Sequence, residues 1–196
     1  TLMYLKFNDI KLYRLIESLY YRWFVKVGSL QADGRSLMAK VAKEKNIAYG
    51  GDLYQQGIRQ FEDNLSLILD QYKTAEIPVI IGSLASNEKD KTPFSALETE
   101  KNISLSTLKK LTQEMRVSRI SQLQAELKHQ SADMAGGYFE LANLQLLEGT
   151  ADIARKNYLS AKDHDSLRFR APESFNQVIK QFSDSPRVTV VDVQES

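Results

Sequence analysis

The chain has 196 residues, of which 42% are hydrophobic and 26% charged. This length suits one large domain or a domain with a small added module, and the composition excludes a disordered or fibrous protein. Its 26 basic and 25 acidic residues leave a formal net charge of +1, so nothing favours binding to nucleic acid or to an anionic membrane. Cysteine is absent, which excludes disulfides, thiolate nucleophiles and cysteine-ligated metal centres.

The N-terminal part of the chain is predicted to be helical. Apolar residues recur at helical spacing over residues 8–25, and Asn8 or Asp9 can cap this helix. We expect its many aromatic side chains to pack in a core, because its polar face lacks the lysines and arginines of a membrane-surface helix. A short lysine-rich helix is predicted at residues 35–45. No apolar run reaches the roughly 18 residues of a membrane-spanning helix, so no transmembrane segment is expected.

A longer amphipathic helix is predicted after Gly50-Gly51, with Asp52 as its N-cap and apolar residues in steps of three and four from Tyr54 to Tyr72. Residues 77–84 then form an apolar, β-branched run that predicts a strand covered on both faces by helices. A second such run follows at residues 187–193. We expect residues 78–84 and 188–193 to be parallel strands of one sheet, which makes the fold class α/β.

The loop at residues 85–90 follows the first predicted strand and is a candidate functional segment. Ligands of open α/β sheets bind beyond the carboxyl ends of the strands, which makes Ser86 and Asn87 candidates for the lining of a pocket. The alternative is that Ser, Asn and Asp serve here only to form a loop.

A helical block follows, with one helix predicted over residues 104–130 and a further helix pair after it. The spacing of the pair resembles one tetratricopeptide repeat, in which small residues let two antiparallel helices approach closely and a glycine makes the turn. The residues that carry this pattern are Tyr138, Leu141, Ala142, Gly149, Ala154, Tyr158 and Ala161. Gln145 and Ser166 depart from it, since an aromatic residue and a proline are usual there. A single repeat is expected to pack against neighbouring helices.

The last predicted helix begins near Pro172, and the sequence contains no complete catalytic motif. There is no nucleophile elbow, P-loop, dinucleotide-binding or zinc-protease motif, so we expect no cofactor and no metal. His129 is predicted to be a solvated residue at a helix end. His164 lies between Asp163 and Asp165, but adjacent residues point in different directions, so this pattern does not predict a catalytic dyad.

Two blocks of sequence nevertheless resemble a known family. Residues 77–94, with Ile-Pro-Val-Ile-Ile-Gly-Ser-Leu-Ala-Ser-Asn, and residues 161–193, with Arg-Phe-Arg-Ala-Pro and Val-Val-Asp-Val, look like the later part of SGNH (GDSL-like) hydrolases that carry a tetratricopeptide-like helical insertion. The resemblance spans about residues 54–193. It implies a flavodoxin-like parallel sheet, to which residues 1–98 and 172–196 would contribute, with residues 99–171 as the helical insertion. Two strands are too few for such a sheet, so the others are expected in a longer protein.

The resemblance also implies hydrolysis of an acyl or carbohydrate ester by a serine and a histidine. The family's nucleophile, oxyanion-hole glycine and asparagine, and histidine do not map onto this chain, which is therefore expected to be an inactive C-terminal portion of a hydrolase. Within it, the predicted pocket-lining residues are Ser86, Asn87, Arg168 and Arg170, which we expect to converge on one cleft. An arginine there could bind a substrate carboxylate or phosphate. The alternative is an ion pair with Asp163 or Asp165 that fixes the insertion in place.

A second interpretation belongs to another class of protein. A helical tetratricopeptide-type module that binds a protein partner without catalysis would explain the repeat and the missing catalytic residues. The two β-branched runs argue against it, because a helical solenoid has no place for strands. The sequence does not indicate the compartment or the oligomeric state.

Overall fold

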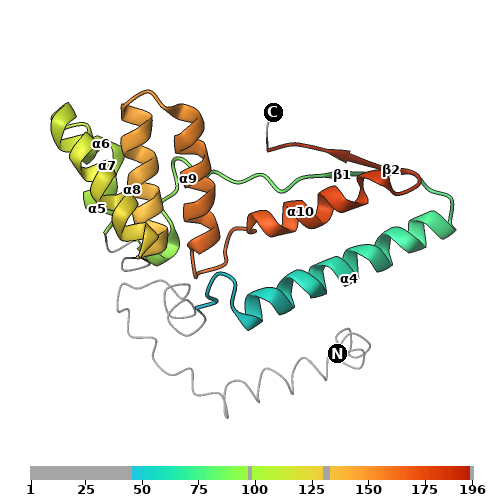
Figure 1. Cartoon of the computed structure of the whole chain (residues 1–196). Helices are drawn as coiled ribbons and strands as arrows, with labels where there is room; N and C mark the ends of the chain where they lie inside the picture. Colours follow the sequence, from blue (N-terminus) through green and yellow to red (C-terminus); the bar gives the residue numbers. More distant parts are fainter. Residues whose placement is uncertain (1–45, 97–98, 130–132, 195–196) are drawn as a thin grey trace, which may run out of the picture. The chain divides into compact units, whose positions relative to one another are not determined.

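The computed structural model describes residues 46–96, 99–129 and 133–194, which belong to one unit of the chain (Figure 1). The helices predicted at residues 8–25 and 35–45 lie outside these residues. In chain order the elements are α4 (Asp52–Thr74), β1 (Val79–Gly82), the 3-10 turn η1 (Phe94–Ala96), α5 (Glu100–Ile103), α6 (Leu105–Leu108), α7 (Gln113–Lys128), α8 (Met134–Leu147), α9 (Ala151–His164), α10 (Glu173–Gln181), the 3-10 turn η2 (Phe182–Asp184) and β2 (Val188–Val191).

The two strands form a parallel pair, although most of the described chain separates them. Val79 pairs with Val188, and the register continues to Gly82 and Val191. This confirms the prediction of two parallel strands in one sheet and a mixed α/β architecture. Both strands are shorter than predicted, because the chain leaves the ladder after Gly82 and after Val191.

The expectation that helices cover both faces of this sheet is wrong for the described residues. Burial alternates along the strands, with Ile80 78% exposed and Val191 45% exposed, while their neighbours are half-buried. The half-buried side chains, Val79 and Ile81 of β1 and Val188 and Val190 of β2, share one face. Alternate residues of a strand point to opposite faces, so this pattern is that of a sheet packed on one side only.

Helix α4 packs against α10 through aromatic and polar contacts. The rings of Phe61 and Phe175 stack with their centroids 4.4 Å apart, and the Tyr54 hydroxyl lies 2.9 Å from that of Ser174. The predicted N-cap is displaced by one residue, because Gly51 occupies the N-cap position and Asp52 is the first helical residue. There its carboxylate favours the helix through the macrodipole rather than through a capping hydrogen bond.

The single helix predicted over residues 104–130 is instead two helices, α6 and α7, separated by residues 109–112. Ser104 is extended and separates α5 from α6, and Thr112 begins α7 by accepting a hydrogen bond from the Met115 amide with its hydroxyl. Such local side-chain bonds compete with helix continuation. The leucines that carried the periodicity still meet in one core cluster, which contains Leu108, Leu123, Leu127, Leu141 and Leu144.

Helices α8 and α9 form the antiparallel pair that the alanine and glycine pattern predicts. Ala142 and Ala154 are fully buried between them, and Gly149 makes the turn with a φ of +79°. The Tyr158 hydroxyl donates to the Asn143 side chain, 2.6 Å away. Gln145, at the position where an aromatic residue was expected, is buried and accepts a hydrogen bond from Asn157, so its polar group is satisfied.

Candidate functional site

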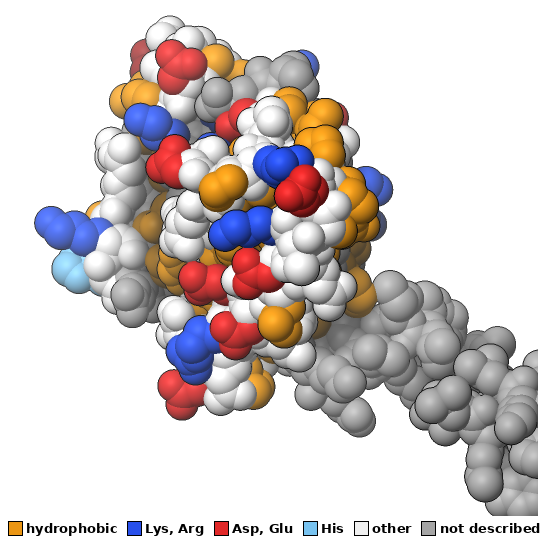
Figure 2. All heavy atoms as spheres, turned by 90° about the vertical axis from the view of Figure 1, so that its right-hand side faces the viewer, with side chains coloured by type: hydrophobic (Ala, Val, Ile, Leu, Met, Phe, Trp, Pro, Cys, Tyr) orange, Lys and Arg blue, Asp and Glu red, His pale blue; other side chains and the backbone are white. Residues whose placement is uncertain are grey.

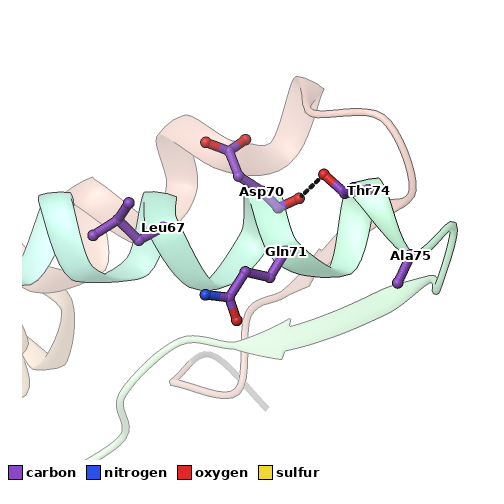
Figure 3. Close-up of a pocket in the computed structure, with 5 residues that line it drawn as sticks. All are labelled: Leu67, Asp70, Gln71, Thr74 and Ala75. Atoms are coloured by element: carbon purple, nitrogen blue, oxygen red, sulfur yellow. Dashed lines mark hydrogen bonds between the residues drawn. The ribbon is translucent and has the colours of Figure 1, made fainter.

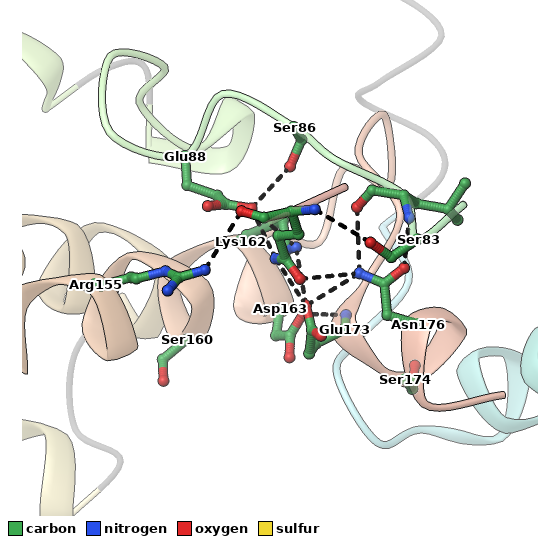
Figure 4. Close-up of polar contacts among 12 residues, drawn as sticks. Ser83, Ser86, Glu88, Arg155, Ser160, Lys162, Asp163, Glu173, Ser174 and Asn176 are labelled. Atoms are coloured by element: carbon green, nitrogen blue, oxygen red, sulfur yellow. Dashed lines mark hydrogen bonds and ion pairs between the residues drawn. The ribbon is translucent and has the colours of Figure 1, made fainter. Parts of the chain in front are cut away.

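A group of polar side chains gathers where β1 and β2 end (Figure 4). We call it the polar cluster; its members are Ser83, Glu88, Lys162, Glu173, Asn176 and Gln194. They come from the end of β1, the loop after it, α9, α10 and the segment after β2. The carboxyl edge of the sheet, where open α/β folds bind ligands, is therefore also the place where the helical block meets the strands.

The side chain of Lys162 is completely buried at the centre of the polar cluster. Its Nζ lies 3.2 Å from Glu88 Oε1 and 3.4 Å from Glu173 Oε2. The side-chain amide of Gln194 donates to the same two oxygens over 3.3 and 3.1 Å. A buried ammonium requires such partners, because removal from water is otherwise costly. The cluster thus joins α9, the loop after β1 and the chain after β2.

Ser83 and Asn176 terminate the strands. The Ser83 hydroxyl donates to Asp192 Oδ1 over 2.8 Å and accepts from the amides of Val193 and Gln194. The Asn176 side chain accepts from the Leu84 amide and donates to the Leu84 carbonyl. Hydrogen bonds from Lys180 and Ser83 hold the pKa of Asp192 below its usual value. The side chains of Ser83, Asn176 and Asp192 therefore hold the backbone in place just after the two strands.

Of the four predicted pocket residues, Arg170 contacts the loop that contains Ser86 and Asn87. Arg170 donates through one guanidinium nitrogen to the carbonyls of Asn87, 3.2 Å away, and Lys91, 3.0 Å away. The Ser86 hydroxyl donates to Glu88 over 3.2 Å. The Asn87 side chain accepts from the amide of Asp90, which is the loop-forming bond that the alternative interpretation predicts. A role in substrate binding for these residues stays a prediction.

Arg168 does not join that loop. Its guanidinium lies 4.9 Å from the ring centroid of Tyr54 and donates to the carbonyls of Ile47 and Asp163. Burial lowers its pKa from the usual arginine value, and one terminal nitrogen is buried without a hydrogen-bond partner among the residues that the structure describes. The expectation that Arg168 faces the Ser86 loop is therefore wrong. The two arginines are two residues apart in an irregular segment, which directs them to different neighbours.

The ion pair considered as the alternative for the arginines is present at Asp165. This carboxylate is 2% exposed and lies 3.3 Å from the Arg170 guanidinium. It also accepts from the amides of Phe94 and Ser95, over 2.8 and 3.0 Å, at the start of η1. Asp165 and Arg170 together therefore tie the loop after β1 to the end of α9.

Among the described residues, the contacts of His164 are with a backbone carbonyl and with aromatic rings. Asp163 accepts from the amide of Glu173 at the start of α10, and Asp165 is used as described above. The His164 Nδ1 donates to the Ser160 carbonyl over 2.8 Å, and its ring lies between Tyr49 and Tyr138 at 4.5 and 5.0 Å. Burial raises the pKa of Asp163 above its usual value. These contacts give His164 a packing role.

Sequence reasoning missed Lys162 and its partners. One signal was available: Lys162 follows Ala154 and Tyr158 at intervals of eight and four, on the buried face of α9. A charged residue at a core position of an amphipathic helix indicates a buried ion pair. Its partners lie far away in sequence, and no local pattern identifies Glu88 or Glu173.

A hollow of about 420 Å³ lies along α4, apart from the polar cluster (Figure 3). Leu67, Asp70, Gln71 and Thr74 line it from this helix, together with Ala75, and the Thr74 hydroxyl donates to the Asp70 carbonyl. No second element contributes a polar group there, so it lacks the convergent groups of a binding site.

Other kinds of site find little support in the part of the chain that the structure describes. No group of three or more histidine and acidic side chains is arranged to hold a metal ion, and no helix is long and apolar enough to cross a membrane. On the face shown in Figure 2, basic and acidic side chains are interspersed. The chain matches no protein-family model, no curated protein and no solved structure.

Proposed function

We propose that this chain is the C-terminal portion of an SGNH-like ester hydrolase. One observation carries the proposal: two parallel strands far apart in sequence end at one polar cluster, to which the loop after β1, the segment after β2 and α9 all contribute. The carboxyl edge of a parallel sheet is where such folds bind ligands. In this proposal the serine nucleophile, the histidine and the remaining strands belong to other parts of the full-length protein.

The serines of this chain act as supporting residues in the proposal. Among the described residues, Ser83 and Ser86 donate to the carboxylates of Asp192 and Glu88. A serine nucleophile needs a neighbouring base such as an imidazole. The low pKa of Asp192 makes it a poor base for this purpose. The loop that contains Ser86 and Asn87 would line the pocket for an acyl or carbohydrate ester, and Arg170 would hold that loop in place.

The test compares this chain with the full-length gene product. A fluorophosphonate probe, which labels activated serines, should label the full-length protein and leave the isolated chain unlabelled. The full-length protein should hydrolyse a short-chain acyl ester, with a Gly-Asp-Ser-like motif before this segment and an Asp-x-x-His motif after it. Turnover by the isolated chain that Ser86→Ala abolishes and the control Ser121→Ala preserves would contradict the proposal, as would a full-length protein without ester turnover.

A helical protein-interaction module without catalysis is the second candidate. The observation that favours it is the α8–α9 pair, with Ala142, Ala154 and Ala161 buried at the helix contact. A partner would bind through the helical block, and the strands would have only a structural role. A full-length sequence that lacks both catalytic motifs, together with partner binding that is lost on deletion of residues 99–171, would favour this candidate.

A further inference from the structure

A groove of about 440 Å³ lies between α4 and α10, on a different face of α10 from the polar cluster. Glu173 and Asn176 point from α10 into the cluster, whereas Ser174, Gln177 and Gln181 line the groove. This volume lies within the range of roughly 300–1,000 Å³ that is typical of small-molecule pockets. The groove is therefore a site separate from the one proposed for ester hydrolysis.

One end of the groove is an aromatic surface. Tyr49 is 50% exposed, yet its ring is held by His164, with centroids 4.5 Å apart, and by Tyr54, at 5.2 Å. Tyr54 is itself fixed by the contact between its hydroxyl and Ser174. An exposed aromatic ring that is already held in position loses little conformational entropy when a ligand covers it. Ile58 and Val178 supply apolar surface beside the rings.

The rest of the lining is polar and carries little charge. The side chains of Gln55, Gln177 and Gln181 are exposed and form no hydrogen bond with any residue that the structure describes. Each primary amide can donate and accept hydrogen bonds at once. Among the described residues that line the groove, Glu62 is the only charged one, and none is a lysine, an arginine or a histidine. An anionic ligand would therefore meet a repulsive charge and no cation.

We propose that this groove binds a neutral sugar. Each sugar ring has a face of C–H groups that can cover an aromatic ring such as Tyr49, and hydroxyls that both donate and accept hydrogen bonds. The amides of Gln55, Gln177 and Gln181 complement those hydroxyls, and the single carboxylate of the lining, from Glu62, favours a neutral ligand over an anionic one. The proposal goes beyond ester hydrolysis and is independent of it, because none of these residues belongs to the polar cluster.

The test is a titration of the 196-residue chain with the neutral disaccharide cellobiose. Amide NMR shifts should concentrate in residues 49–62 and 174–181, with millimolar affinity. Tyr49→Ala should weaken binding about tenfold, since the stacking surface is lost. Tyr72→Ala is the matched control, because Tyr72 is a 44% exposed tyrosine on α4, the helix that borders the groove, and does not line the groove. Thermal melts of both variants should match the wild-type chain.

Parallel titrations with choline and with a proline-rich peptide separate the alternatives. Choline would use the aromatic rings and Glu62 as a cation site, whereas the peptide would use the rings as a docking groove. Shifts at the groove with either of these and none with cellobiose would overturn the proposal. So would cellobiose shifts outside the groove, equal weakening by Tyr72→Ala, or no shifts at high millimolar sugar.

Discussion

Replacing Lys162 by methionine removes the ammonium group that Glu88 and Glu173 share in the polar cluster. Methionine fills a similar volume, so the main effect is electrostatic: two carboxylates, which are 14% and 22% exposed, are left beside each other without a cation. Breaking one partner out of a buried ion pair costs about 3–5 kcal/mol. Because both carboxylates keep some contact with water, we expect the lower end, about 3 kcal/mol.

Urea unfolding of the chain measures this loss directly. The control is Lys156→Met on the same helix, where an exposed lysine is replaced and the free energy of unfolding should change by about 0.5 kcal/mol or less. A loss of 3 kcal/mol corresponds to a melting temperature lower by about 6–12 °C for a chain of this size. Amide exchange at Leu84 and Gln194 should also accelerate, because the carboxylates that the Asn176 and Gln194 side chains contact lose the ammonium that holds them in place.

A second variant separates charge from packing. The triple change Lys162→Met, Glu88→Gln and Glu173→Gln removes all three charges, and it should recover much of the lost stability because no unpaired charge stays buried. Equal urea midpoints for Lys162→Met and Lys156→Met would refute the reasoning, since the cluster would then contribute nothing. A triple variant no more stable than the single one would show that packing, rather than charge, explains the loss.

Further predictions follow from single contacts. Arg170→Ala should cost about 1–3 kcal/mol in thermal or urea unfolding, because the buried Asp165 loses a charged partner; an unchanged midpoint would contradict this. The lowered pKa of Asp192 means that its stabilisation is present above the unfolded value of about 4 and is lost as the pH falls further, so Asp192→Asn should flatten the acid limb of the stability curve. Gly149→Ala should cost about 1 kcal/mol because φ is +79° there, whereas Gly57→Ala within α4 has open space and should stabilise by about 0.5–1 kcal/mol; equal effects would refute the argument.

The sequence patterns that predicted the structure correctly were those in which a local feature is compatible with only one kind of backbone conformation. An apolar β-branched run before Gly82 has few alternatives to a strand, and Gly149 between two alanine-bearing segments has few alternatives to a helix turn. Periodicity failed over residues 104–130, because the leucine spacing continues across the short interruption at residues 109–112, between α6 and α7. Leucines of α6 and of α7 pack in the same core cluster, so their spacing in the sequence resembles that of one continuous helix.

The candidate site was harder to predict because it depends on contacts between distant segments. The position of the loop predicted that Ser86 and Asn87 line a pocket, and the return of the chain from the helical block predicted that Arg170 lies beside that loop, where it contacts the Asn87 carbonyl. Arg168 was expected beside them, but Tyr54 and Ile47, from segments before β1, provide nearer partners. The position of Glu173 beside Lys162 depends on how α9 and α10 meet, which no local spacing encodes.

The two hydrogen bonds between the Asn176 side chain and the Leu84 backbone limit how a further strand can be added to the sheet. In β1 the amides of Val79 and Ser83 donate to β2, so the backbone groups of the even-numbered residues point to the other edge. At Leu84 that edge is already occupied by the Asn176 side chain, which accepts from the amide and donates to the carbonyl as a neighbouring strand would. Any strand added beside β1 can therefore pair with Ile80 and Gly82 and must end before Leu84, so the polar cluster stays beyond the last hydrogen bond that such a strand could make.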